Sequence, residues 1–80
     1  MRNATANCYK WYNVEIPYNT GESIKRADAF RNWLYENNFK HEPSACGDFV
    51  HFEIFMSADD VEMVNIALDR IVWFDTIREF

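Results

Sequence analysis

The chain has 80 residues, of which 18% are aromatic and 26% charged, and its formal net charge is −5. Such a composition, with two glycines and two prolines, excludes a disordered chain and predicts one compact domain over residues 1–80 with an aromatic-rich core. No apolar run approaches the roughly 20 residues of a membrane span and the N-terminus has no apolar signal segment, so we expect a cytoplasmic protein without membrane contact.

The first half of the chain predicts a strand followed by a helix. Over residues 8–16, aromatic and β-branched residues alternate with polar ones, which places Trp11 on the face opposite to the apolar one. Turn-prone residues 17–21 end this strand. Residues 22–38 show helical spacing, and the asparagines at 37–38 tolerate the left-handed conformation of a helix end. The apolar face of the strand consists of Tyr12, Val14 and Ile16, and that of the helix consists of Ile24, Ala27, Phe30 and Leu34.

Two further strands form a predicted hairpin. Residues 39–46 make a short strand in which Pro43 favours an edge position, because proline has no N–H for a neighbouring strand. Gly47 and Asp48 form the turn, and residues 49–56 form the strongest strand of the chain. Large apolar side chains occupy both of its faces, whereas a sheet covered on one side is usually polar on the other. One face consists of Val50, Phe52, Ile54 and Met56, and the other consists of Phe49, His51, Glu53 and Phe55.

A second helix is predicted from Ser57, a favourable N-cap residue with Asp60 three positions later, to about Phe74. The element order is therefore β-α-β-β-α, which predicts an α+β fold with an antiparallel sheet and two helices packed on one face. A last strand over residues 76–80 would complete a ferredoxin-like βαββαβ arrangement. The core stripe of the second helix consists of Val61, Val64, Leu68, Ile71 and Val72.

The outer face of this helix carries apolar residues where charged groups are usual. Ile66 and Trp73 are seven residues apart and therefore lie on one line of a helix, with Met63 beside them. Tryptophan and methionine framed by carboxylates are typical of interaction surfaces. This face is one candidate partner-binding surface, and the alternative is that the C-terminal tail folds back over Trp73 and Phe74. The acidic residues of this face are Asp59, Glu62 and Asp69.

The open face of the sheet is the second candidate surface, through Trp11, Phe49 and Phe55. Residues 49–52, with the sequence Phe-Val-His-Phe, resemble the end of the third-strand motif of the RNA recognition motif. This resemblance implies a βαββαβ fold that binds single-stranded RNA by stacking bases on the three aromatic side chains. The basic residue and the glycine that precede this segment in the family are replaced here by Ala45, Cys46 and Asp48 around Gly47.

No pattern in the sequence points to catalysis, to a metal or to a cofactor. Tetrahedral metal sites use ligand spacings such as C-x₂₋₄-C and H-x₃₋₅-H, which His41, Cys46 and His51 do not match. His51 and Glu53 share a strand face, but no nucleophile elbow or phosphate-binding loop accompanies them. We therefore expect a protein that is not an enzyme and needs no cofactor. The sequence leaves open whether Cys8 and Cys46 form a disulfide.

The distribution of charge narrows the class of partner. Residues 1–40 hold six basic and four acidic side chains, a net +2, whereas residues 41–80 hold two basic and nine acidic ones, a net −7. Binding to nucleic-acid phosphates needs clustered lysine and arginine, so direct nucleic-acid binding is disfavoured. The leading hypothesis is an acidic protein-binding inhibitor that occupies the surface of a larger complex, including a nucleic-acid-binding one, as anti-CRISPR and other anti-defence proteins of bacterial viruses do in the host cytoplasm. The alternatives are single-stranded RNA binding and a structural homodimer.

Overall fold

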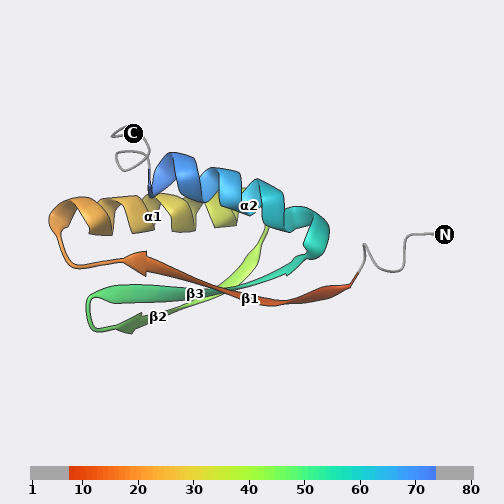
Figure 1. Ribbon diagram of the computed structural model, residues 1–80, viewed down its shortest axis with the longest axis horizontal. Coiled ribbons are helices and arrows are strands. Elements are labelled where there is room, and N and C mark those ends of the chain that lie inside the picture. Colours follow the sequence, from red (N-terminus) through yellow and green to blue (C-terminus); the bar gives the residue numbers. More distant parts are fainter. Residues whose placement is uncertain (1–7, 74–80) are drawn as a thin grey trace.

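The computed structural model describes residues 8–73. Their elements follow the predicted order: β1 (Tyr9–Pro17), α1 (Gly21–Glu36), β2 (Lys40–Cys46), β3 (Phe49–Ser57) and α2 (Ala58–Ile71). Both helices pack on one face of a three-stranded antiparallel sheet, in contact with each other (Figure 1). The α+β class and the arrangement in two layers are therefore confirmed. Neither of these two helices is long and apolar enough to cross a membrane.

The strand order is β1-β3-β2, with β3 in the centre and antiparallel to both neighbours. β2 is an edge strand, as its proline predicts, and it forms the predicted hairpin with β3. Gly47 allows the tight turn between them, because its φ of 62° lies in the left-handed region that glycine adopts without strain. The predicted last strand over residues 76–80 lies outside the described residues.

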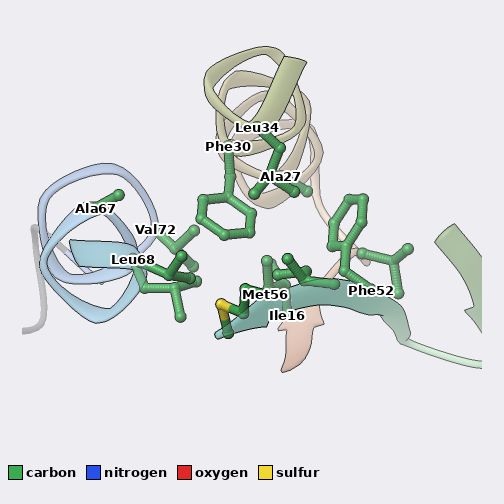
Figure 2. Close-up of a cluster of buried hydrophobic side chains, with 12 residues drawn as sticks. Ile16, Ala27, Phe30, Leu34, Phe52, Met56, Ala67, Leu68 and Val72 are labelled. Carbon is green, nitrogen blue, oxygen red and sulfur yellow. The ribbon is translucent and has the colours of Figure 1, made fainter. Parts of the chain in front are cut away.

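The alternation of side chains along β3 decides which face the helices cover. Every second residue from Val50 to Met56 is buried beneath the helices, as the sequence predicts. Phe30 of α1 meets this face, and its ring stands edge-on to the Phe52 ring with 5.8 Å between centroids (Figure 2). Full burial of one such side chain contributes about 1.5–3 kcal/mol. The buried apolar residues are Ile16, Ala27, Phe30, Leu34, Val50, Phe52, Ile54, Met56, Val64, Ala67, Leu68 and Val72.

Local hydrogen bonds determine where both helices begin. At α1, the Thr20 hydroxyl accepts from the N–H of Ser23 at 3.0 Å, and the Ser23 hydroxyl accepts from the N–H of Thr20 at 2.9 Å. This reciprocal capping box starts the helix at Gly21, one residue earlier than predicted. At α2, the Asp60 carboxylate accepts hydrogen bonds from the N–H and the hydroxyl of Ser57, so Ser57 is the N-cap as predicted.

α2 ends at Ile71, and the expectation that it continues to about Phe74 is wrong. The N–H of Val72 donates to the Leu68 carbonyl at 2.8 Å, and the N–H of Trp73 donates to the same carbonyl at 3.0 Å. The second of these bonds spans one residue more than the regular helical bond and closes the last turn. Trp73 therefore lies beyond the helix.

Candidate functional site

An open groove lies between the two helices, with a volume of about 490 Å³. We call it the helix groove. Trp33 of α1 and Asn37, the residue that caps the end of α1, line one side, and residues between Asp59 and Arg70 line it from α2. Four of the eight lining residues, Asp59, Glu62, Met63 and Ile66, belong to the partner-binding surface that the sequence predicts on the second helix. The full lining consists of Trp33, Asn37, Asp59, Glu62, Met63, Ile66, Ala67 and Arg70.

The end of α1 holds Trp33 in position. The N–H of Phe39 donates to the Leu34 carbonyl at 2.9 Å, and Asn38 adopts a left-handed φ of 63°, the geometry that commonly closes a helix. This turn brings the Phe39 ring onto Trp33, with 5.7 Å between centroids, and the Phe30 ring also stacks on Trp33 at 6.1 Å. Trp33 is half-buried as a result, and two ring contacts restrict its movement.

The α2 side of the helix groove carries two exposed apolar side chains. Met63 and Ile66 are 42% and 48% exposed, whereas Val64 and Leu68 of the same helix are buried in the core. Residues three apart lie on one face of a helix, so Met63 and Ile66 form a continuous apolar strip. Covering this strip would contribute about 25 cal/mol for each Å² of apolar surface removed from water.

Charged residues lie toward both ends of this strip. Asp59 and Glu62 come from the N-terminal half of α2, and Arg70 comes from its last turn. All three are exposed, and none of them forms an ion pair with another described residue. The helix groove therefore has an acidic end and a basic end, and both charges are available to a partner.

Trp73 does not line the helix groove. Because α2 ends at Ile71, Trp73 leaves the helical line of Ile66, and the prediction that these two residues lie on one line of the helix is wrong. Trp73 is half-buried, packs against the core and lines a separate hollow beside the start of α1. Asp69 is exposed on α2 but is also absent from the lining. The alternative in which the tail covers Trp73 concerns residues 74–80, which lie outside the described part of the chain.

Four lining residues, Trp33, Asn37, Ala67 and Arg70, are not among the partner-binding residues predicted from the sequence. Trp33 lies one helical turn after Phe30, which is a signal that it sits near the core face of α1. The sequence does not say which residues of α2 it meets, because that depends on how the two helices pack.

Of the three aromatic residues predicted on the open sheet face, Trp11 and Phe55 lie together and Phe49 lies apart from them. The Phe55 ring lies 5.2 Å from the Trp11 ring and 5.5 Å from the Tyr9 ring, measured between centroids. Lys40 Nζ lies 6.0 Å from the centre of the Trp11 ring. Tyr9 was missed, although the alternation of β1 places it on the same face as Trp11. Phe49 lies six residues along β3 from Phe55, roughly 20 Å away, so it does not join the cluster.

Charged side chains occupy the middle of the open sheet face. Glu53 stands directly opposite Glu42 of β2, which is an unfavourable pairing of like charges. His51 Nε2 lies 3.1 Å from Glu15 Oε2 on β1, so His51 pairs with Glu15 rather than with Glu53 on its own strand. The carboxylates of Glu15, Glu42 and Glu53 outnumber the single lysine of this face, Lys40, and would repel phosphate. This excess of negative charge weakens the RNA-binding hypothesis. The same charges oppose the close approach of a second copy through this face.

The residues considered for chemistry are dispersed. Ser44 of β2, a hydroxyl that could act as a nucleophile beside a histidine, lies opposite His51 in the register of β2 and β3, but no hydrogen bond joins these two side chains. His41 lies on the helix side of β2, away from His51, and its ring contacts aromatic side chains. Among residues 8–73, no group of three or more His, Cys, Asp or Glu is placed to hold a metal ion. Cys8 and Cys46 lie at opposite ends of the sheet, roughly 26 Å apart along β3, and no disulfide joins them.

The described residues thus form a small α+β domain with a helix groove on one side and an open sheet face on the other. Comparisons of the chain with known protein families, with curated proteins and with solved structures gave no match. The function therefore has to be inferred from the two surfaces.

Proposed function

We propose that the protein is a non-catalytic protein-binding module that inhibits a larger complex by occupying part of its surface through the helix groove. The observation that carries this proposal is the exposed strip of Met63 and Ile66 beside the half-buried Trp33. A concave apolar surface with a charged rim has the usual composition of a protein-binding site. An inhibitor of this kind needs only a surface complementary to its target.

The charge of α2 supports a partner with a basic surface. This helix carries four carboxylates against one arginine, Arg70. Opposite charges on two proteins speed their encounter and select the correct partner. Nucleic-acid-binding proteins have basic surfaces where the nucleic acid binds. An acidic module that occupied such a surface would also exclude the nucleic acid from it. The four carboxylates are Asp59, Asp60, Glu62 and Asp69.

The most specific form of the proposal is an anti-CRISPR-type inhibitor from a bacterial virus, acting in the host cytoplasm on a nucleic-acid-binding defence complex. Its support is the acidic surface of α2, whose charge is opposite to that of a nucleic-acid-binding channel. We expect expression of the protein to protect a targeted plasmid, and Glu62→Lys combined with Asp69→Lys to remove the protection. Plasmid loss that is unchanged by the protein in every type of CRISPR system would contradict this form and would leave protein binding untouched.

Site-specific photo-crosslinking tests protein binding itself. A benzophenone amino acid replaces Ile66 in one variant and Phe49 in a matched variant, and both are irradiated in the cells that make the protein. We expect a protein adduct from position 66 and none from position 49. A nucleic-acid adduct from position 49 would favour the RNA alternative, and an adduct of twice the chain mass would favour the homodimer. The absence of any adduct from position 66 would contradict the proposal.

We also propose the finer fold, in which residues 76–80 add a fourth strand and complete a ferredoxin-like βαββαβ sheet. β1 and β2 run parallel with β3 between them, which is the split β-α-β arrangement of that fold. The outer edge of β1 pairs with no strand of residues 8–73, so it is the edge where a fourth strand would add. Backbone chemical shifts at 76–80 are expected to report extended structure with slow amide exchange, and helical shifts would contradict this fold.

A further inference from the structure

We infer that the helix groove receives a basic amphipathic helix of the partner, lying antiparallel to α2. This inference rests on the proposed function, because it names the chemistry of the partner that the groove would bind. Three features of the groove support it: the backbone of its walls, its length and the order of its charges.

Along Met63 and Ile66, the walls of the helix groove offer side chains and no backbone partners. Away from the helix ends, the backbone N–H and C=O groups of α1 and α2 bond within their own helices, so an extended segment lying over Met63 and Ile66 would bury unsatisfied polar groups. A helix satisfies its own backbone and presents only side chains. It is therefore the element that covers this apolar strip at the lowest cost, as in other helix-in-groove complexes.

The length of the helix groove matches about three turns of a helix. Its lining runs along α2 from Asp59 to Arg70, a distance of about 16 Å at a rise of 1.5 Å per residue. A partner helix of about 11 residues spans this distance and places apolar side chains at i, i+3 or i+4, and i+7 against Met63, Ile66 and Trp33. A helix of this length is only marginally stable by itself. It therefore folds as it binds the groove, or it belongs to a larger domain of the partner.

The order of charges sets the direction of the bound helix. Asp59 and Glu62 mark the N-terminal end of α2, and Arg70 marks its C-terminal end. Helices favour acidic residues in their first turn and basic residues in their last turn. An antiparallel helix therefore brings its basic last turn to Asp59 and Glu62 and its acidic first turn to Arg70, whereas a parallel helix brings like charges together. The lining holds two carboxylates against one arginine, which favours a basic amphipathic helix over a neutral one.

Selection of binders from a display library of random 16-residue peptides on the intact protein tests this inference. We expect the enriched peptides to carry apolar residues at helical spacing and lysine or arginine in the last turn. They should bind Ile66→Asp at least tenfold more weakly and bind Phe49→Ser, the matched variant of the open sheet face, as well as the parent. Circular dichroism should show a gain of helix on binding. A nitroxide at the peptide C-terminus should broaden the amide signals of Asp59 and Glu62 more than that of Arg70.

A charge reversal tests the electrostatic part. Glu62→Lys is expected to weaken a selected peptide about tenfold at low salt, and a peptide with glutamate in place of its basic residue should recover the loss. Thermal unfolding shows whether each variant is folded, and Ile66→Ala, which keeps a strong helix former, replaces Ile66→Asp if the latter unfolds.

The outcomes separate this inference from the proposed function. Extended bound peptides, enriched peptides without basic residues, or stronger broadening at Arg70 would overturn the inference and leave protein binding in the groove intact. A selection in which no enriched peptide distinguishes Ile66→Asp or Ile66→Ala from the parent would overturn both.

Discussion

The helix groove and the open sheet face both expose apolar side chains, but the neighbours of those side chains differ. In the groove, Met63 and Ile66 face solvent beside a fixed Trp33, and charges stand at the two ends. On the sheet face, the exposed rings of Tyr9 and Trp11 contact Phe55 across the strands, and carboxylates occupy the middle. Apolar exposure alone therefore does not identify a binding surface. The contacts that each exposed side chain already makes are equally informative.

This difference has an energetic consequence. Ring contacts across strands stabilise a sheet by about 0.5–1.5 kcal/mol for each pair. Met63 and Ile66 contribute less to the folded state, because much of their surface remains in water. Substitutions in the α2 strip should therefore change binding more than stability, and substitutions in the sheet cluster should change stability more than binding.

The largest effect is expected for Trp33→Ala, which should reduce both stability and binding. This side chain supports the groove and also stacks on Phe30 and Phe39, so its loss should lower the free energy of unfolding by about 2–3 kcal/mol and abolish peptide binding. Urea denaturation and titration with a selected peptide measure both. A loss of stability below about 0.5 kcal/mol would show that these ring contacts do not hold Trp33.

Ile66→Asp should separate binding from folding. We expect binding of the partner to weaken by about 2 kcal/mol or more, roughly 30-fold, because an apolar anchor is replaced by a carboxylate at an acidic groove. The free energy of unfolding should change by no more than about 0.5–1 kcal/mol, since Ile66 is exposed. Isothermal titration measures the binding free energy, and urea denaturation measures the free energy of unfolding. Equal losses in these two free energies would contradict the distinction between the two surfaces.

Trp11→Ala should show the reverse behaviour. Loss of its contact with Phe55 should lower the free energy of unfolding by about 1 kcal/mol, while binding to the groove stays at the parent value. A double-mutant cycle with Phe55→Ala measures the pairwise energy. Weaker partner binding by Trp11→Ala at unchanged stability would instead make the sheet face the interface.

Glu53→Lys should produce the smallest change. It replaces the like-charged pair of Glu53 and Glu42 by an attractive one, so the free energy of unfolding should rise by about 0.5 kcal/mol at low salt and return to the parent value at about 1 M salt. Thermal unfolding at the two salt concentrations tests this. New affinity of this variant for single-stranded RNA, with none in the parent, would show that charge is what prevents RNA binding on this face.

Periodic patterns were sufficient to predict the elements and the faces they bury. The alternation of residues 49–56 assigned the buried face of β3 correctly, and Pro43 assigned β2 to an edge. The end of α2 was not predictable in this way, because the residues around Ile71 continue the apolar pattern. Trp73 leaves the helix and packs against the core, which is a tertiary contact.

Sequence patterns alone were sufficient for the order of the elements, the α+β class, the N-cap at Ser57 and the uneven division of charge. The fold was needed to show that Trp33 and the strip of Met63 and Ile66 line one groove, and that the cross-strand partner of His51 is Glu15. These two kinds of feature differ in the distance along the chain between the residues that produce them. Periodicity and capping depend on residues within a turn or two of each other, whereas a groove or a cross-strand pair depends on the packing and register of segments that are far apart in the sequence.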